Sequence, residues 1–551
     1  MDRRRFLGAL ATAGAGTLAG CRRSGGPPLP PGELRGTALE VGHLLRDARL
    51  AEAVETRKVA VLIVGAGVGG LSAAWKLARS GFSDFLIVDL EDEAGGNSRA
   101  GRNAVSAYPW GAHYLPLPTR EATAVRELLA ELGVLEGDPR AARPVYDERY
   151  LCATPQERLY LNGRWQEGLL PQAGVDRAAR EQIRRFAELV DDFRHRRDAS
   201  GRRAFALPMD LSSRDAALLA LDRVSMRDWL LSLGLDLPQL HWYVNHACRD
   251  DYGADSATVS AWAGIHYFAC RDGEAANAAG ETVLTAPEGN AWLVRGMLES
   301  IRARAGDRLL TGALAHRVLA GETRSSAHPV AVDLWLPTER RTLRVLTAQL
   351  IWAAPVFLVP RIFAGRADLQ AAARGFTYAP WLIANLTLSR LPVDRAGAPP
   401  AWDNVLHDSA GLGYVIATHQ AMRLRSTDSV WTWYRALDSV SPQEGRAVLR
   451  DTPREVWAEE ILADLERPHP DIRQVTTRLD VYRNGHAMVR PLPGLIWGDA
   501  RQRLAGEGGD VLFAHADLSG FSLFEEAQYR GVLAAERTLR RLGVRHPTSL
   551  R

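Results

Sequence analysis

A glycine-rich turn between an apolar strand and a helix constrains this chain more than any other feature. The run Val59–Val64 is short, apolar and rich in β-branched residues, which is typical of a buried parallel strand. It leads directly into a G-x-G-x-x-G pattern. The segment 71–80 then has helical spacing, and Gly81 is expected to close the helix. Strand, glycine turn and helix in this order predict a doubly wound, Rossmann-like α/β domain that binds a dinucleotide.

Each glycine of the turn has a separate physical role. Gly65 permits the tight turn, Gly67 lets the backbone approach a pyrophosphate, and Gly70 lets helix and strand pack closely. The helix N-terminus presents free N–H groups and a partial positive charge to the phosphates. We therefore expect these residues to hold the pyrophosphate of the dinucleotide.

A second apolar strand, Phe85–Val88, ends at Asp89. A carboxylate at this point is expected to hydrogen-bond the adenosine ribose. It disfavours NADP, because it would repel the 2′-phosphate. This element alone leaves NAD open.

Asp89 is followed by five residues and then by the pair Gly95 and Gly96. This pattern resembles the flavin amine oxidase superfamily, which also contains protoporphyrinogen oxidases and phytoene-type desaturases. The resemblance implies FAD as the cofactor, a second glycine loop that includes Gly96, and an arginine that contacts the FAD phosphates. The family's arginine directly follows the glycines. Asn97 takes that place here, so the resemblance assigns the role to Arg99 or Arg102.

Segments in the middle of the chain resemble the family in the same order. The motif 108–113, YPWGAH, resembles the segment beneath the flavin ring, which implies contacts from Gly111, Ala112 and His113. The stretch 289–318 resembles the return to the FAD domain, with Ala315 against the adenine. The segment 221–230 resembles the helical substrate domain, where Ser225 begins a helix with a capping box.

The C-terminal region resembles the family's closing motif. A short apolar strand, 511–514, is followed by Asp517, and a helix opens at Phe524 and Ala527. The resemblance implies that Asp517 contacts the ribityl–phosphate chain. It also implies that the helix N-terminus faces the flavin pyrimidine, where reduction places negative charge. The family has a small residue where this chain has Glu526. An NAD enzyme would not need this motif, so it favours FAD over NAD.

The catalytic residue stays unknown at this stage. Many amine oxidases of the superfamily place a lysine near flavin N5, on a strand that the resemblance assigns to Trp381–Leu388. That stretch holds no lysine, since lysine occurs only at Lys58 and Lys76. The flavin itself accepts the hydride, and an acid–base group adds only about 10²–10⁴-fold. Covalent members attach FAD through a cysteine near the C-terminal region. No cysteine follows Cys270, so we expect non-covalent FAD.

Histidines and cysteines add no further chemistry from sequence. For His113, and equally for His266, His486 and His515, packing or hydrogen bonding is the simpler interpretation. No H-x-H or H-E-x-x-H spacing indicates a metal site, and no G-x-S-x-G indicates a serine hydrolase. Cys248 and Cys270 could pair in an exported protein, and the sequence leaves this open.

The N-terminus resembles an export signal. Residues 3–7, RRRFL, fit the twin-arginine pattern, and a weakly apolar stretch leads to Leu18–Cys21. The latter resembles a bacterial lipoprotein processing site with Cys21 as the lipidated residue. We predict export by the twin-arginine machinery and a lipid-anchored protein of the periplasm or cell envelope. The Pro- and Gly-rich segment Arg22–Glu33 is expected to be a flexible tether. Such a route carries folded proteins, which suits a cofactor inserted before export.

Charge limits the partners. A net charge of +3 over 551 residues gives no support to a nucleic-acid partner. The segment Arg180–Arg197 is expected to form a charged helix with a narrow apolar stripe. Its simplest interpretation is a solvated helix of the substrate domain, and the alternative is a contact with a membrane surface.

These observations predict a doubly wound FAD domain and an α+β substrate domain built from insertions. The expected function is removal of a hydride from a small-molecule substrate, with an amine or polyamine as the donor. The alternatives are desaturase-like or porphyrinogen-oxidase-like dehydrogenation of an apolar substrate, and a non-catalytic flavoprotein that binds an envelope partner. The predicted boundaries are signal peptide 1–20, tether and linker 21–57, FAD domain 58–150, 286–365 and 491–545, and substrate domain 151–285 and 366–490.

Overall fold

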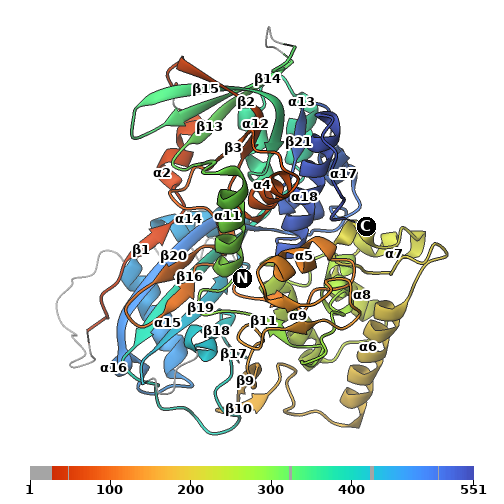
Figure 1. Ribbon diagram of the computed structural model, residues 1–551. Helices are drawn as coiled ribbons and strands as arrows, with labels where there is room; N and C mark the ends of the chain where they lie inside the picture. Colours follow the sequence, from red (N-terminus) through yellow and green to blue (C-terminus); the bar gives the residue numbers. More distant parts are fainter. Residues whose placement is uncertain (1–27, 48, 322–325, 422–426, 507, 551) are drawn as a thin grey trace, which may run out of the picture.

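The computed structural model describes residues 28–47, 49–321, 326–421, 427–506 and 508–550. Figure 1 shows two sheets and a group of helices: a seven-stranded sheet in the upper part, an eight-stranded sheet at the lower left, and helices at the lower right. The predicted leader, including Cys21, lies outside the described residues. Within the described part of the chain, no helix combines the length and hydropathy needed to cross a membrane.

The seven-stranded sheet has a parallel core. β12, β3, β2, β15 and β21 run parallel, while β14 and β13 extend the sheet antiparallel beyond β15. Its strands come from three separate stretches of the chain, as expected for a doubly wound domain interrupted by insertions. The strands are β12 (Leu309–Leu310), β3 (Phe85–Val88), β2 (Ala53–Val64), β15 (Arg341–Trp352), β14 (Val330–Leu336), β13 (Leu314–Ala320) and β21 (Val511–Phe513).

The central strand β2 is buried on both faces. Val61 and Ile63 pack into one core, against α4 (Val68–Arg79), α11 (Ala291–Ala305) and α18 (Phe524–Arg541). Leu62 and Val64 pack into a second core on the opposite face. This explains why the run is apolar throughout rather than alternating. The strand begins at Ala53, before the predicted Val59, because its exposed first residues pair with β15.

Helix α4 confirms the helix predicted after the glycine turn, although it begins at Val68 rather than Leu71. Its C-terminus is closed by Gly81, whose φ is +76°. The Gly81 N–H donates to the Ala78 carbonyl, and the Phe82 N–H donates to the Leu77 carbonyl. This is the Schellman arrangement, which requires a left-handed residue and so favours glycine.

The eight-stranded sheet forms the second layer. Along β16, Leu382 and Ala384 face one core and Trp381 and Ile383 face another, so both faces are covered. Helices α14 (Pro442–Asp451) and α15 (Arg454–Glu466) cover the first face. The strand order is β1 (Leu34–Gly36), β20 (Thr476–Val489), β16 (Tyr378–Leu388), β19 (Ser429–Ala436), β18 (Gly413–Ile416), β17 (Asp403–Leu406), β9 (Glu157–Leu161) and β10 (Arg164–Glu167).

The helical part lies beside this sheet. Ser225 begins α8 and accepts a hydrogen bond from the Asp228 N–H, as predicted. Cys248 and Cys270 are free, buried cysteines in this part of the protein. The helices are α6 (Arg177–His195), α7 (Ala216–Ala220), α8 (Met226–Ser232), α9 (Pro238–Tyr252) and α10 (Ala261–Ala269).

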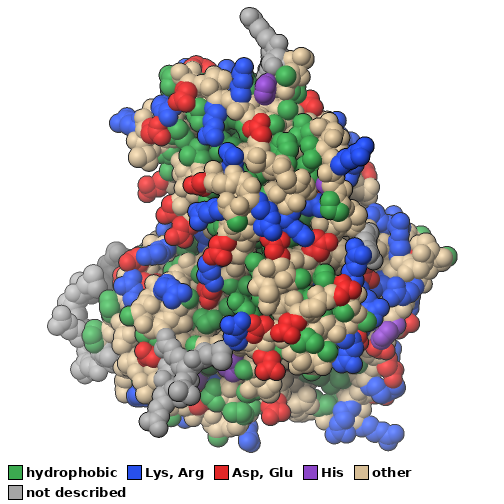
Figure 2. Space-filling model, viewed as in Figure 1, with side chains coloured by type: hydrophobic (Ala, Val, Ile, Leu, Met, Phe, Trp, Pro, Cys, Tyr) green, Lys and Arg blue, Asp and Glu red, His purple; other side chains and the backbone are tan. Residues whose placement is uncertain are grey.

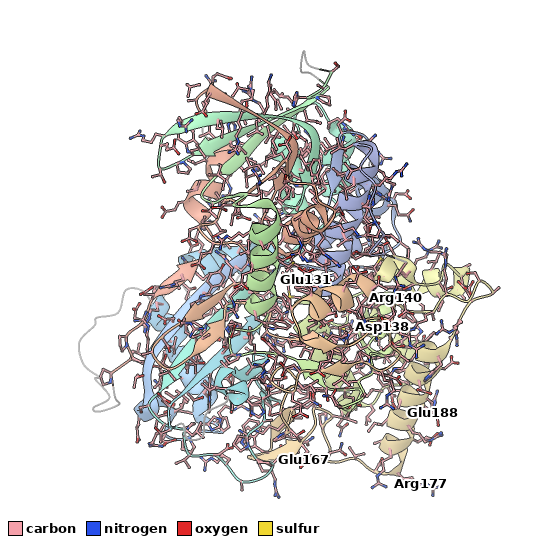
Figure 3. The ribbon with its side chains drawn as sticks, viewed as in Figure 1. Glu131, Asp138, Arg140, Glu167, Arg177 and Glu188 are labelled. Carbon is pink, nitrogen blue, oxygen red and sulfur yellow. The ribbon has the colours of Figure 1, made fainter. Side chains whose placement is uncertain are left out.

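The charged helix predicted at Arg180–Arg197 is α6. Phe186 and Phe193 of its apolar stripe are buried. In Figure 3 the labelled Arg177 and Glu188 of this helix point away from the body of the protein. Figure 2 shows Lys and Arg side chains interspersed with Asp and Glu over this face of the molecule. The helix is therefore a solvated element with one packed stripe.

Shorter elements complete the fold. Three two-stranded pairs connect the larger layers: β4 (Ala100–Arg102) with β5 (Ala107–Pro109), β6 (Leu115–Pro116) with β11 (Val283–Leu284), and β7 (Leu135–Glu136) with β8 (Val145–Tyr146). The remaining helices are α2 (Leu39–Gly42), α3 (Leu44–Asp47), α5 (Thr123–Glu131), α12 (Val359–Ile362), α13 (Ala367–Ala373), α16 (Ile472–Val475) and α17 (Asp499–Gly506).

The last residues of the predicted tether are hydrogen-bonded to strand β20. The Pro31 carbonyl accepts from the Leu479 N–H, and the Glu33 carbonyl accepts from the Val481 N–H, both at 2.9 Å. The expectation of flexibility is therefore wrong for residues 31–33. A proline lacks only the donor, so its carbonyl can still pair with an edge strand, here β20. The predicted linker, 21–57, also contains β1, α2, α3 and the first residues of β2.

A buried ion pair joins the two helices that cover the parallel sheet. Lys76 of α4 lies 3.2 Å from Glu536 of α18, and both side chains are almost fully buried. Lys76 Nζ also donates to the Pro547 carbonyl and to Ser549 Oγ. Burial lowers the Lys76 pKa, an effect that Glu536 opposes. The only other lysine, Lys58, is exposed.

We predict that Lys76→Ala destabilises the protein strongly, by about 3–5 kcal/mol, because it leaves Glu536 buried without its partner. Lys58→Ala is the matched control and should change stability by no more than about 0.5 kcal/mol. Chemical denaturation of both variants measures the difference. Equal stabilities would contradict the role assigned to the pair.

Candidate active site

A cavity of about 560 Å³ lies at the carboxyl ends of the parallel strands. Val64, Val88 and Trp352, the last residues of β2, β3 and β15, all contribute to its wall. This is where open α/β sheets bind their ligands. Ten of the thirteen residues predicted for the cofactor line it: Gly65, Gly67, Asp89, Gly96, Arg99, Ala112, Ala315, Asp517, Phe524 and Ala527.

The three glycines of the turn differ in what surrounds them. A Cβ on Gly65 would lie 2.7 Å from the Ala353 carbonyl group, and the φ of Gly65 is +104°. A Cβ on Gly70 would lie 1.8 Å from the Gly65 carbonyl oxygen, so Gly70 serves the packing of helix against strand rather than the cavity wall. A Cβ on Gly67 would meet no protein atom nearer than 4.0 Å. The open space at Gly67 is the space that a ligand would occupy.

Asp89 lies in the cavity wall and holds the glycine turn. Its Oδ2 accepts from the Ala66 N–H at 2.5 Å, and its Oδ1 accepts from the Glu91 N–H at 2.8 Å. Burial raises the Asp89 pKa, and these two N–H groups oppose the rise. The carboxylate therefore shapes the turn itself. The predicted contact with a ribose stays a prediction.

Arg99 also lines the cavity, but its guanidinium is already engaged. Nη1 lies 2.9 Å from Glu91 Oε2, and Nη2 donates to the Tyr482 hydroxyl at 2.5 Å. The alternative, Arg102, is exposed on β4. Asn97, which stands where the family has its arginine, donates instead to the Ala487 carbonyl. Of the two arginines, only Arg99 is in the wall.

The closing motif brings Asp517 into the same cavity. Its Oδ2 accepts from the Val356 N–H at 2.9 Å and from the Tyr378 hydroxyl at 2.6 Å. His515 Nδ1 lies 3.1 Å from Oδ1. Burial alone would raise the Asp517 pKa, but His515 and the two hydrogen bonds outweigh it and leave the pKa below its usual value. Asp517 is thus held ionised at the cavity wall.

Two helices begin at this cavity. Val68 and Gly69 of α4 line it, and so do Phe524 and Ala527 of α18. The first N–H groups of a helix have no partner within the helix and carry partial positive charge. Both helix N-termini therefore favour a ligand with negative charge.

Glu526, the departure from the family pattern, points away from the cavity into a buried polar cluster. Its Oε1 accepts from the Met209 N–H at 2.6 Å. Burial raises its pKa to about 7, against the effect of Arg530. Arg530 in turn pairs with Asp210 at 2.6 Å. A larger residue fits here because the helical region supplies its partners.

A second cavity of about 130 Å³ adjoins the first. The two share part of their walls, including Asn97, Ala112 and Phe524. Gly111 and His113, predicted to lie beneath the cofactor, line this second cavity rather than the first. The second cavity lies between the start of α18, the eight-stranded sheet and the helical region. It is the natural place for a substrate.

Aromatic side chains form one side of the second cavity. The rings of His113 and Tyr434 stack with centroids 4.8 Å apart, and Trp381 meets Tyr434 edge-on at 6.5 Å. Burial lowers the His113 pKa to about 4, so this ring is neutral near pH 7. On β16, the strand that the resemblance assigns to the family's lysine, the side chains in the wall are Trp381 and Ile383.

Acidic side chains form the other side. Asp250 and Asp251 end helix α9, and Glu525 lies in the first turn of α18. Arg271 is the guanidinium in the wall, and its Nη2 donates to Asp251 Oδ1 at 2.7 Å. Glu525 is 3% exposed, and its Oε1 has no hydrogen-bond partner in the described part of the protein.

Burial is the main cause of the raised pKa values of two of these acids. Burial, reinforced by Asp251, raises the Asp250 pKa to about 7, although Arg271 and Arg249 oppose the rise. Burial also raises the Glu525 pKa to about 7. Each of these carboxyl groups needs a proton or a cation at neutral pH.

Sequence reasoning missed this acidic wall. Asp250, Asp251 and Arg271 come from helix ends in the least specific part of the chain, and their spacing carries no known motif.

The interpretation of His266 as a packing and hydrogen-bonding residue is confirmed. It is buried, stacks on Phe521 and contacts the Ala206 carbonyl. His486 lines the first cavity and stacks on Phe357. Among the described residues, no group of three or more His, Cys, Asp or Glu side chains could share a metal ion.

Comparison with known proteins agrees with this geometry. Residues 63–132 match the family model of an NAD(P)-binding Rossmann-like domain. No curated protein matches the chain. Among solved structures, a variant of putrescine oxidase from a redesign of cofactor binding is similar at a TM-score of 0.63 and 15% identity, over 88% of this chain and 100% of that one.

Two further structures show the same likeness. Putrescine oxidase bound to putrescine has a TM-score of 0.60 and 15% identity, over 87% of this chain and 99% of that one. Cyclohexylamine oxidase from Brevibacterium oxydans IH-35A has a TM-score of 0.61 and 16% identity, over 88% of this chain and 100% of that one. The chain has the fold of these amine oxidases. The predicted fold class is therefore confirmed.

Two glycine substitutions separate binding from folding. Gly67→Val should fold normally, because the φ of −71° and ψ of −177° suit valine and no protein atom is in the way, yet it should lose the dinucleotide. Gly70→Ala should instead destabilise the fold, by about 1–3 kcal/mol, because its Cβ meets the Gly65 carbonyl. Cofactor content and melting temperature measure the two effects. A Gly67→Val protein that retains its cofactor would show that the open space is not the binding site.

Proposed function

We propose that the protein is an FAD-dependent oxidoreductase that removes a hydride from an amine. The cavity supports FAD by its donor set as well as by its fold. Two helix N-termini and the open space at Gly67 suit a pyrophosphate. The volume of about 560 Å³ lies within the range of about 300–1,000 Å³ expected for cofactor pockets.

The acidic wall of the second cavity carries the proposal of an amine. Asp250, Asp251 and Glu525 face it together with one guanidinium, that of Arg271. Arg271 is already paired with Asp251. A protonated amine would supply the missing positive charge to Asp250 and Glu525. An apolar donor would leave the buried Glu525 and the half-buried Asp250 without a compensating charge, which is costly.

The aromatic wall supports the same donor. Trp381 and Tyr434 present π faces and edges to the cavity, and aromatic faces attract cations. The same rings exclude water, which strengthens the electrostatic interactions inside the cavity. The pairing of aromatic and acidic walls orients an ammonium group and its neighbouring carbon.

Residues of this chain can also accept the proton that the substrate's ammonium group must lose. An ammonium group must lose a proton before its carbon can release a hydride, and FAD supplies the hydride acceptor when bound. A carboxyl group with a pKa of about 7 is well matched to accept that proton near neutral pH. We propose Asp250 and Glu525 for this role, in place of the lysine that the chain lacks. The N-terminus of α18 favours negative charge on the reduced cofactor.

The decisive experiment is an anaerobic absorption titration of the purified protein with amines, amino acids and porphyrinogens. We expect amines to bleach the flavin and air to restore it. Bleaching by an apolar donor alone would contradict an amine substrate. An oxidised spectrum that no donor changes would contradict the proposal of an enzyme.

The apparent affinity for amines should depend on pH. As the pH falls through about 7, Asp250 and Glu525 take up protons and lose their attraction for the ammonium group. We therefore expect KM to rise below about pH 7. We also expect Asp250→Asn to raise KM by about tenfold or more, because it removes one charge-assisted hydrogen bond of about 1.5–3 kcal/mol. Asp92→Asn, at an exposed position, is the control. A KM that stays constant between about pH 6 and about pH 8 would contradict the assignment.

We also propose that the protein is exported by the twin-arginine route and anchored through a lipid on Cys21. This rests on the sequence pattern at residues 3–21. Cys21→Ser should move the protein from the membrane fraction to the soluble fraction of the envelope, as measured by fractionation. Membrane attachment that survives this substitution would contradict the lipid anchor.

A further inference from the structure

The segment 34–47, called the strap below, comes before the seven-stranded sheet in the chain. It nevertheless forms part of the wall of the larger cavity, the proposed cofactor site. Seven of its residues line the cavity: Thr37, Ala38, Leu39, Gly42, His43, Leu45 and Arg46. No glycine motif or family resemblance marks this segment in the sequence, where it was part of the predicted tether and linker.

The strap is fixed at both ends, on different layers of the protein. At its start, β1 pairs in parallel with β20 of the eight-stranded sheet, with Leu34 opposite Val481. Near its end, Leu45 packs against the core that also holds Leu62 and Val64 of β2, in the seven-stranded sheet. Between these points the chain crosses the cavity wall (Figure 1, where β1 lies at the left edge of the lower sheet and α2 below the upper sheet).

One hydrogen bond ties the middle of the strap to the cofactor-binding loops. The Ala38 N–H donates to Glu91 Oε1 at 2.9 Å. The other oxygen of Glu91 pairs with Arg99. Gly42 lies close to Leu90, whose Cδ2 would be 3.6 Å from a Cβ at that position. The strap thus rests on the residues that follow Asp89.

The strap also brings positive charge to the cavity. Within the described part of the chain, Arg46 makes no ion pair and no side-chain hydrogen bond, unlike Arg99 in the same wall. His43, Arg46 and His486 line the same cavity. Burial lowers the His486 pKa to about 4, and the charges of Arg446, Arg46 and His43 lower it further. A dinucleotide contributes a doubly charged diphosphate, which unpaired cationic groups favour.

We propose that the strap is part of the cofactor site: it closes the cavity over the dinucleotide and adds Arg46 as a cationic contact, so that it retains a cofactor held without a covalent bond. The proposal rests on the proposed binding of FAD but not on the amine. It makes a prediction for release of the cofactor that the amine substrate does not affect.

The test measures how fast bound FAD leaves the holoprotein, from the rise in flavin fluorescence after dilution. Ala38→Pro removes the N–H that Glu91 accepts, at a residue whose φ of −65° suits proline. Arg46→Glu reverses the unpaired charge. We expect each to speed release about tenfold, the equivalent of about 1.4 kcal/mol. Arg302→Glu, on the exposed face of α11, is the matched control and should leave the rate unchanged.

The outcomes separate this proposal from the proposed function. If both variants release FAD at the rate of the unaltered protein, the proposal that the strap retains the cofactor is wrong. Faster release with an unchanged melting temperature of the cofactor-free protein would support it, because the change then acts on retention rather than on folding. Unaltered protein that binds no FAD at all would overturn the proposed function instead.

Discussion

The close backbone approach at the glycine turn is the constraint on which the rest of the structure depends. Gly70 allows α4 to start directly against the Gly65 carbonyl, and Gly69 allows α4 to meet the Ala514 carbonyl, to which its Cβ would come within 2.3 Å. A Cβ on Gly531 of α18 would lie 2.1 Å from the Gly69 carbonyl. The last of these contacts brings α4 and α18 together, and the first residues of both helices line the same cavity. The positive ends of both helices then face the same ligand.

This packing explains why the first and last parts of the chain were predictable. A strand, a glycine turn and a carboxylate leave little conformational choice, so β2, α4 and β3 lie where the spacing places them. The same holds for β21 and α18, whose sequence must fit against α4. Twelve of the thirteen predicted cofactor residues line one of the two cavities, and the thirteenth, Gly70, shapes the turn.

The acidic wall and the strap were not predictable for the opposite reason. Asp250, Arg271 and Glu525 meet only through the packing of helices from distant parts of the chain, and such packing leaves no periodic signal. Residues 31–36 were interpreted as a tether because proline and glycine disfavour regular structure. Their pairing depends on the free edge of β20, which local sequence does not reveal. Both missed features lie where the layers meet.

The departures from the family pattern have local compensation. Asn97 replaces the family's arginine and bonds to the Ala487 carbonyl, while Arg99 enters the cavity wall two residues later. Glu526 replaces a small residue and finds the Met209 N–H and Arg530. The missing lysine leaves β16 with Trp381 and Ile383 at the cavity, opposite carboxyl groups whose pKa lies near 7. The chemistry of the second cavity therefore differs from the pattern that the resemblance implies.

The larger cavity is proposed to hold one FAD without a covalent bond. Acid precipitation of the purified protein, followed by chromatography of the supernatant, tests it most directly. We expect FAD in the supernatant at about one molecule for each chain, with a colourless pellet, as one dinucleotide site in the doubly wound domain requires. NAD in the supernatant, or flavin that stays with the precipitated protein, would contradict it.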